Sequence, residues 1–467
     1  MITRILPVTA AIFAGALSSA NAANVPMNWT GFYAGVNAGY GAALDPVTQS
    51  FTPSTNGGYQ FAIAPQGWFG GGQLGYNWQT GPLVLGLEAD AQGGHASQAL
   101  CYDFCGVGTF GISQTQTWYA TMRGRLGWAY GPVLLYGAGG AAFTTIKTNL
   151  SQTLGNTVSG EFSDTRTGWT LGAGVEGVLA GPWSAKIEYL YMDFGSVTHS
   201  IPEALLGPAF PVEFSMALRE HVVRAGINYH FGAPTTAKAQ PVERFVRASP
   251  TPDWTGFYVG GNIGYAVQRS PYEQSSDGIV FNQFTFVPGS IGGGIQAGGT
   301  LQLDRIALGV EADYQAVRQN QSQCGDFCLP NQSRNISESS GWFATVRGRA
   351  GVVWGPAWYY VTGGAAFTNI KTEYVGLDPI PFVQGGFSDS RAGWTVGAGI
   401  EAMMWRNWSL KAEYLYMDFG TITHAMPYIN GFGPGEEAFS IHVRDHVFRL
   451  GLNYHFGGRG VPDESSH

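Results

Sequence analysis

The sequence predicts an all-β protein, a transmembrane antiparallel β-barrel. Three observations lead to this fold class: a composition poor in charge, an N-terminal segment typical of secreted proteins, and short strands of period two whose connections alternate between tight and long. The length of 467 residues suggests roughly two to four domains.

The composition favours a membrane environment. Charged residues make up 12% of the chain, about half the usual fraction, while aromatic residues reach 14% and 69 residues are glycine. The formal net charge of −8 argues against a nucleic-acid-binding protein, which normally carries a basic face. Because 44% of the residues are hydrophobic, the chain is not expected to be disordered either. We therefore expect no nucleic-acid partner and a surface that faces lipid.

Residues 1–22 have the pattern of a secretory signal peptide. Arg4 supplies the positive charge, Ile5–Leu17 the apolar stretch and Ala20–Ala22 the small-residue end, so cleavage is expected before Ala23. A transmembrane anchor is the alternative, but the apolar stretch is short for one. Beyond Ala23 we find no apolar stretch long enough for a helical span. A secreted, charge-poor chain of this kind is expected to cross a membrane as a β-barrel.

The rest of the chain is a tandem duplication. Trp29–Tyr33 recurs as Trp254–Tyr258, and Tyr189–Gly195 recurs as Tyr414–Gly420, at an offset of 223 to 225 residues. A period this long indicates duplicated domains rather than a solenoid. A proline-rich stretch between the copies is typical of a linker. The predicted divisions are a signal peptide at 1–22, a β-barrel repeat at 23–232, a linker at 233–252, a second repeat at 253–457 and a tail at 458–467.

Each copy is predicted to hold eight strands. Tight turns are expected at Gly81-Pro82, Gly131-Pro132 and Gly181-Pro182, since Gly-Pro pairs are strong turn signals. The other connections are longer and rich in Ser, Thr, Gly and Pro. Outer-membrane barrels show this alternation, with short periplasmic turns and long extracellular loops. The predicted strands of the first copy are 29–41, 68–79, 83–95, 115–130, 133–148, 164–180, 183–195 and 217–231.

The strand at 115–130 indicates which face meets lipid. One face is apolar from Trp118 to Trp128, and the other carries Arg123 and Arg125. An apolar band with an aromatic residue at each end is typical of a lipid-facing surface with two interfacial girdles. The second copy repeats the pattern, so the predicted girdle residues are Trp118, Trp128, Trp342 and Trp354.

The same alternation places ionisable side chains of both signs in each lumen. A balanced set can pair internally, whereas unpaired charges in a confined lumen would be costly. Because an eight-stranded barrel is filled by its own side chains, we expect an ion-paired plug. A mixed-charge constriction of a narrow pore is the alternative. The predicted lumen charge network comprises Glu88, Asp90, Arg123, Arg125, Glu176, Lys186, Glu188 and Arg224, and in the second copy Glu311, Asp313, Arg347, Arg349, Glu401, Lys411, Glu413 and Arg449.

The four cysteines form two matched pairs, each in the second long loop of its copy. In an oxidising compartment we expect the local disulfides Cys101–Cys105 and Cys324–Cys328. A zinc-type metal site would need four suitable ligands, and only Asp103 or Asp326 lies nearby. We therefore expect no bound metal.

Histidines are the remaining candidates for chemistry. His221 and His446 are predicted to face outward near the outer rim, and His230 and His455 to lie at the periplasmic end of the last strands. We find no Ser–His pair with a matching acid on one face. The prediction is therefore a protein without catalysis and without a bound cofactor.

Three motifs carry a resemblance to a known family: the opening Trp29–Tyr33, the segment Glu188–Gly195 and the closing Arg224–Phe231, each present again in the second copy. They resemble the small outer-membrane surface-antigen barrels of Gram-negative bacteria, the OmpA-like and opacity-type superfamily often called porin-family proteins. That family usually has one barrel and ends on an aromatic residue, whereas this chain has two copies and continues beyond Phe456.

The resemblance implies a cell outer membrane location in a Gram-negative bacterium, contact with outer-membrane lipid and insertion by the barrel-assembly machinery. It implies a structural or surface-exposed role without catalysis. Passive diffusion of small solutes is one alternative. A receptor for haemin or a host surface, acting through the extracellular loops, is another.

Two architectures fit the duplication. The join at 233–252 is much longer than the tight turns, and each copy has its own balanced set of interior charges. Both observations favour two tandem eight-stranded barrels. A single sixteen-stranded barrel, which would hold an aqueous channel, is the alternative.

Overall fold

The described part of the chain consists mainly of β-strands. In the computed structural model they number nineteen, and the described residues contain no helix long and apolar enough to span a membrane. The structure describes residues 28–51, 58–102, 105, 109–130, 132–154, 156–203, 207–232, 252–276, 278–324, 334–376, 383–405, 407–430 and 433–456. The predicted signal peptide, the predicted tail and nearly all of the predicted linker lie outside these residues.

The first copy closes into an eight-stranded antiparallel barrel. Its strands are β1 (Gly31–Ala43), β4 (Gln66–Thr80), β5 (Leu83–Tyr102), β6 (Thr109–Tyr130), β7 (Val133–Leu154), β8 (Asn156–Ala180), β9 (Trp183–Glu203) and β10 (Gly207–His230). Consecutive members of this series pair with one another. β1 also pairs with β10, from Tyr33 opposite His230 to Ala43 opposite Glu220. This last pairing closes the barrel.

The second copy closes in the same way. Its strands are β11 (Gly256–Ser276), β13 (Gly289–Leu303), β14 (Ile306–Cys324), β15 (Arg334–Trp354), β16 (Ala357–Gly376), β17 (Val383–Trp405), β18 (Trp408–Asn430) and β19 (Gly433–Phe456). β11 pairs with β13 on one side and with β19 on the other. Each copy thus closes on itself, so the architecture is two eight-stranded barrels and not one of sixteen strands.

Three strands lie where long connections were predicted. β2 (Asp45–Phe51) and β3 (Gly58–Ile63) form a hairpin after β1, and β12 (Ile279–Phe286) pairs with the far part of β11. The predicted strands were also too short, because β5 and β6 stay paired as far as Tyr102 opposite Phe110. The prediction followed only the apolar lipid-facing band. The ladder continues beyond that band, where outward residues such as Ser113 and Thr115 are polar while Phe110 and Ile112 stay buried inside.

The tight turns lie where the sequence predicted them, between β4 and β5, β6 and β7, and β8 and β9. Gly81 and Gly181 adopt φ angles of 59° and 52° in two of these turns. In the second copy, Asp304 adopts φ 57° in the turn that matches Gly81, a conformation that aspartate tolerates better than most residues. We call this end of each barrel the turn end and the opposite end the loop end.

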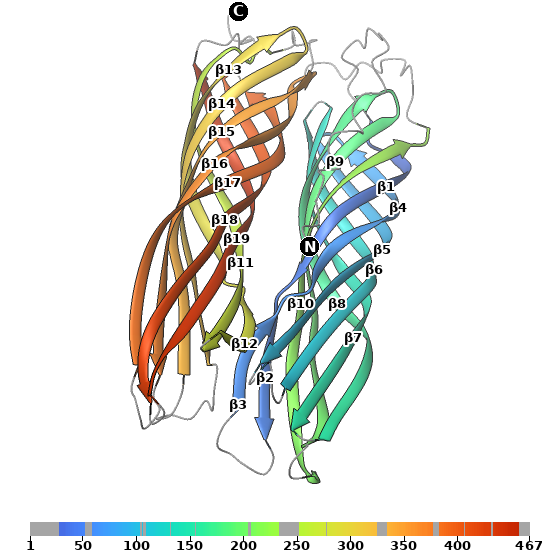
Figure 1. The fold of residues 1–467 in the computed structure, drawn as a ribbon. Coiled ribbons are helices and arrows are strands. Elements are labelled where there is room, and N and C mark those ends of the chain that lie inside the picture. The colour runs from blue at the N-terminus through green and yellow to red at the C-terminus, as the bar shows by residue number, and fades with distance from the viewer. Residues whose placement is uncertain are drawn as a thin grey trace, which may run out of the picture.

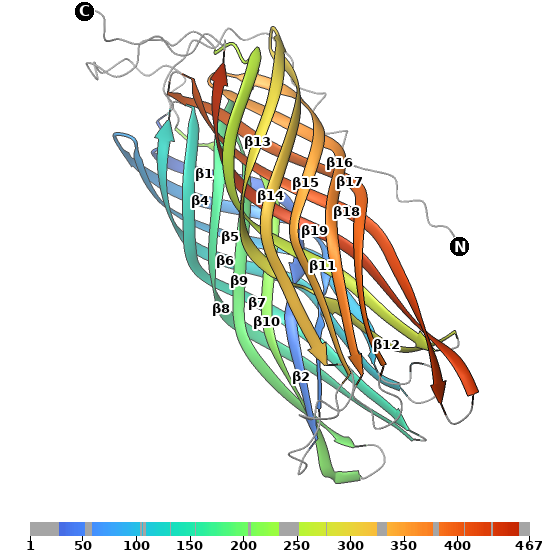
Figure 2. The same ribbon diagram turned by 90° about the vertical axis from the view of Figure 1, so that its left-hand side faces the viewer.

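The two barrels stand side by side, with the β2–β3 hairpin and β12 between them toward the loop end (Figure 1). The strands of both barrels slant around their own axes (Figure 2). At the loop end, Gln98 Nε2 donates a hydrogen bond of 2.8 Å to Thr285 Oγ1, and Arg269 Nη2 donates one of 3.2 Å to the carbonyl oxygen of Ala64. The two copies are therefore joined by direct contacts.

The contact surface between the barrels, which we call the seam, has an aromatic and an aliphatic part. Toward the loop end, His221 stacks on Tyr265 and Tyr40 stacks on His446. Toward the turn end, outward side chains of both copies bury one another. This aliphatic part includes Val133 and Val175 of the first barrel and Ala357, Ile400, Ala402 and Ala412 of the second.

The seam corrects the prediction for His221 and His446. Both imidazoles do face outward, but His221 is buried and His446 half-buried against the neighbouring barrel instead of lying at a free rim. The sequence could not distinguish an outward side chain that meets lipid from one that meets a second barrel, because both environments favour apolar and aromatic residues.

Candidate functional site

A layer of ion pairs crosses the lumen of the first barrel. Arg123 projects from β6 and contacts three carboxylates: Glu88, Asp90 at 3.0 Å and Glu188 at 2.8 Å. On the other side of the layer, Arg224 from β10 contacts Asp90 at 2.9 Å. The side chains of these five residues are fully buried. Side chains from strands that lie far apart in the sequence thus contact one another inside the closed barrel.

Two further bases complete this layer. Lys186 Nζ lies 3.0 Å from Glu88 Oε2 and 3.7 Å from Glu188 Oε2. Arg125 reaches Glu176 at 2.7 Å, and its guanidinium lies 3.9 Å from the ring centroid of Tyr136. Each charged group in the set therefore has at least one partner of opposite sign, as buried charges require.

The second barrel repeats the network with equivalent residues. Arg347 contacts Glu311, Asp313 at 2.9 Å and Glu413 at 3.0 Å. The remaining contacts follow the first barrel: Arg349 with Glu401, Lys411 with Glu311, and Arg449 with Asp313 and Glu413. All sixteen residues of the predicted charge network thus lie in the two lumens, eight in each.

Sequence reasoning missed the tyrosine in each charge layer. The Tyr33 hydroxyl donates to Glu88 Oε2 at 2.7 Å and accepts from Arg125 Nη1 at 2.6 Å. Tyr258 bridges Glu311 and Arg349 in the same way. The alternation of β1 carries the signal, because Phe32 faces lipid and Tyr33 must then face the lumen.

Each lumen also holds a Ser–His–Glu cluster, which contradicts the expectation that no such grouping exists. Ser184 Oγ donates to Glu176 Oε1 at 2.6 Å, and His230 Nε2 lies 2.9 Å from Ser184 Oγ and 3.3 Å from Glu176 Oε1. One imidazole nitrogen contacts both partners, whereas a catalytic relay places the serine and the acid on opposite nitrogens. Ser409, His455 and Glu401 form the same cluster in the second barrel.

Apolar side chains fill the lumen on the loop side of the ion pairs. Phe69, Leu190 and Met192 of the first barrel are buried there, as are Leu415 and Met417 of the second. They alternate along their strands with outward residues, so they point inward. Each barrel interior therefore has a charged, paired layer, followed by a layer that is mainly apolar but also holds buried polar groups such as Glu220 and Glu338.

The predicted girdle residues lie on the outside of the barrels, Trp118 and Trp342 toward the loop end and Trp128 and Trp354 toward the turn end. Trp118 and Trp128 are exposed, and Arg305 lies over the ring of Trp354 at 5.1 Å. Trp342 stacks on Tyr314 with ring centroids 5.8 Å apart.

Cys101 and Cys105 form a disulfide, with their Cα atoms 5.6 Å apart. Cys324 is also disulfide-bonded, but its predicted partner Cys328 lies outside the described residues. The residues that the structure describes contain no group of three or more His, Cys, Asp or Glu side chains able to hold a metal ion.

Comparison with known proteins agrees with this architecture. The family described as outer membrane protein beta-barrel domain matches residues 9–231 and, a second time, residues 245–456. The 31 kDa outer-membrane immunogenic protein of Brucella melitensis biotype 1 is 33% identical over 231 residues, which cover 48% of this chain and 89% of that protein. The 22 kDa outer membrane protein of Rhizobium leguminosarum bv. viciae is 32% identical over 166 residues, 34% of this chain and 66% of that protein.

Among solved structures, a Pseudomonas aeruginosa FadL homologue aligns with 91% of this chain and 90% of its own. The sequence identity is 11% and the TM-score 0.27, so this likeness carries no argument. The family match covers both copies almost completely, and the named relatives are outer-membrane proteins of Gram-negative bacteria. The chain therefore belongs to the outer membrane protein beta-barrel family, as a tandem duplication of its domain, and lies in the outer membrane.

Proposed function

We propose that the protein is a structural, surface-exposed component of the outer membrane whose two barrels are closed to solutes. The turn end would face the periplasm and the loop end the outside, as in other outer-membrane barrels. Outer-membrane lipid and the barrel-assembly machinery are the partners that this role requires. The proposal includes no catalysis.

The ion-paired layer is the observation that carries this proposal. The carboxylates and guanidinium groups of the layer satisfy one another at 2.7–3.3 Å with fully or almost fully buried side chains. Charges that line a water-filled pore would instead be solvated and accessible. An eight-stranded barrel also has too small an interior to leave a channel once its side chains are in place.

Surface exposure is supported by two observations. The strands extend well beyond the girdle at the loop end, for example from Trp118 to Thr109 on β6. The Brucella relative is named an immunogenic protein, and an outer-membrane protein that presents its loops to the outside would fit that name. Binding of haemin or a host surface by the loops stays a second, weaker hypothesis.

Planar-bilayer conductance of the refolded full-length protein tests the closed state. We expect no conductance or only small, flickering events, and no uptake of small sugars into proteoliposomes. Large, stable conductance steps would overturn the proposal in favour of a diffusion porin. A trimeric porin reconstituted in parallel checks that the assay detects an open channel.

A further inference from the structure

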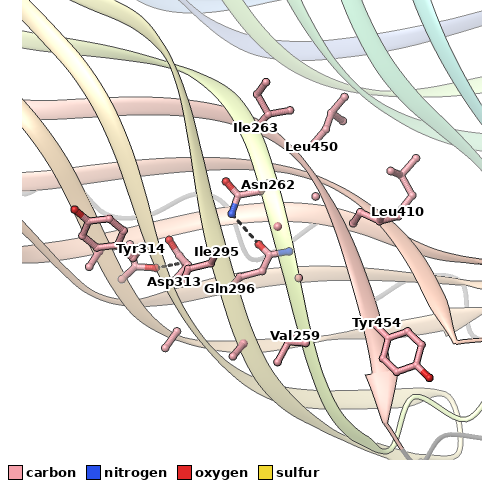
Figure 3. Close-up of a pocket in the computed structure, with 18 of the residues that line it drawn as sticks. Val259, Asn262, Ile263, Ile295, Gln296, Asp313, Tyr314, Leu410, Leu450 and Tyr454 are labelled. Atoms are coloured by element: carbon pink, nitrogen blue, oxygen red, sulfur yellow. Dashed lines mark hydrogen bonds between the residues drawn. The ribbon is translucent and has the colours of Figure 1, made fainter.

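The second barrel has a groove on its lipid-facing wall (Figure 3). The volume of the groove is about 1150 Å³, and it crosses β11, β13, β14 and β15. Small residues form the floor of the groove, and Ala297 lies directly opposite Ala312 in the pairing of β13 with β14. The floor residues are Gly261, Ala297, Ala312 and Ala344.

Large apolar side chains form the rims. Ile263 and Ile295 are 60% and 70% exposed, and Val346 is 52% exposed, so they stand out from the wall. The polar residues that border the groove, Asn262, Gln296, Asp313 and Thr345, are buried on the lumen side of the wall. The Asp313 carboxylate, for example, contacts Arg449 and Arg347. The surface of the groove is therefore almost entirely hydrocarbon.

The first barrel lacks this shape at equivalent positions. Val36 stands where the second barrel has Gly261, and Leu74 stands where it has Ala297. Both are large and exposed, at 66% and 62%. The rim positions also differ: the first barrel has the small residues Ala38 and Gly72 where the second has Ile263 and Ile295. The two copies share their lumen network but differ here, so closing a barrel does not require the groove.

The groove continues into a second recess between the two barrels. This recess has a volume of about 410 Å³ and is lined by Leu126, Leu135 and Val175 from the first barrel. Leu410 and Leu450 of the second barrel border both the recess and the groove. The two recesses thus meet at one pair of leucines beside the seam.

The surroundings determine what can occupy these recesses. The groove runs from Trp408 and Tyr454 near the turn end toward Tyr314, which stacks on Trp342 of the outer girdle. The wall between these aromatic residues is surrounded by the acyl chains of the membrane. Water would find few hydrogen-bond partners on such walls. If the space were empty, the residues that line it would lose van der Waals contacts.

We propose that a diacyl phospholipid binds here as a retained ligand, with one acyl chain in the groove and the other in the recess between the barrels. Its headgroup lies near Trp408 and Tyr454, at the periplasmic face, where the outer membrane presents phospholipid. This inference rests on the outer-membrane location and on the proposed orientation of the turn end toward the periplasm, but it does not depend on whether the lumens conduct. Failure of one proposal therefore leaves the other intact.

The test is native mass spectrometry of the full-length protein extracted from outer membranes in a mild detergent. We expect a bound mass equal to one phospholipid. The double variant Gly261→Val/Ala297→Leu installs the residues of the first barrel and should reduce the retained lipid at least tenfold. A Cβ atom at position 261 would meet nothing closer than 3.7 Å, so the wall accepts a side chain there.

The first barrel provides the matched control. The variant Val36→Gly/Leu74→Ala changes the same positions in the other copy and should retain lipid like the wild type. Heat-modifiable mobility on gels shows whether each variant is folded. Equal lipid retention by the groove-filling variant would overturn the proposal, as would a bound mass of lipopolysaccharide or of a second protein copy in place of phospholipid.

Discussion

The imidazole of His221 stacks on the phenol ring of Tyr265, with ring centroids 5.6 Å apart and planes inclined by 7°. His221 belongs to the first barrel and Tyr265 to the second. Their equivalents in the opposite copies, His446 and Tyr40, stack on each other with centroids 6.0 Å apart and planes inclined by 12°. The contact is thus reciprocal, as in a two-fold symmetric dimer interface.

We expect this seam to hold the barrels together without the linker. A protease site introduced into residues 233–250 of the full-length protein should yield two fragments that co-migrate in mild detergent. Gly177→Leu should separate them after the cut, because a Cβ atom at position 177 would lie 1.8 Å from the Tyr359 hydroxyl of the other barrel.

The control for this experiment is Gly72→Leu on the free lipid face, where a Cβ atom would meet only a carbonyl oxygen at 3.8 Å. This variant should stay associated after cleavage. Fragments that separate in the wild type would show that the linker, and not the seam, keeps the barrels together.

Removing one base from the ion-paired layer should be strongly destabilising. Arg123→Met leaves Glu88, Asp90 and Glu188 short of one cation, and such a broken buried pair costs about 3–5 kcal/mol. Guanidinium unfolding of the refolded protein in micelles measures the loss. Arg219→Met is the control, because its side chain is 47% exposed in a 3.5 Å pair with Asp193, and it should cost less than about 1 kcal/mol. Equal losses of unfolding free energy in both variants would contradict a stabilising ion-paired layer in the lumen.

Glu338 should make the stability fall as pH rises. It lies on the loop-end part of β15, beyond Trp342, and burial raises the pKa of its carboxyl to about 8. The unfolded chain loses this proton near the ordinary pKa of 4.5, whereas the folded protein keeps it. The stabilising contribution is therefore complete below that pKa and is lost as the pH rises toward 8.

The variant Glu338→Gln should remove this component of the pH dependence. Denaturant midpoints measured from about pH 5 to about pH 9 report it. Glu373→Gln, an exposed position on the neighbouring β16, should leave the wild-type slope unchanged. An identical slope for the wild type and for Glu338→Gln would show that Glu338 ionises normally.

The disulfide between Cys101 and Cys105 should act locally. The bridge closes a very short loop, so its removal should cost the barrel less than about 3 kcal/mol, the value for a longer loop of about 15 residues. Cys101→Ser/Cys105→Ser should speed proteolysis in the β5–β6 connection while the unfolding midpoint changes little. Loss of the folded, heat-modifiable form would mean that the disulfide is needed for folding of the barrel.

Much of the fold was predictable because strand alternation is a strict constraint. A shift of one residue would move Arg123 and Arg125 to the lipid face and Trp118 into the lumen, so the pattern fixes both register and orientation. The interior ion pairs follow from that register together with closure. The alternation is the same in both copies and can be followed without knowledge of distant contacts.

The seam and the groove could not be predicted in this way. Val133 in the seam and Leu74 on the lipid face are both outward and apolar, although one is buried and the other is 62% exposed. Alternation reports only the face of a strand and not what covers that face. The strands beyond the girdle were missed for a related reason, because no membrane imposes an apolar face on them.

The reciprocal stacking of His221 on Tyr265 and of Tyr40 on His446 holds two copies side by side that one chain supplies in equal number. A pair of identical subunits can only present two identical sets of surface loops. Here a contact of two-fold type joins copies of different sequence, so each molecule carries two different loop sets as neighbours in a one-to-one ratio. Loop segments that do not touch the neighbouring barrel can change under selection without altering the stacked pairs, and a bivalent target would meet two distinct epitopes at a constant spacing.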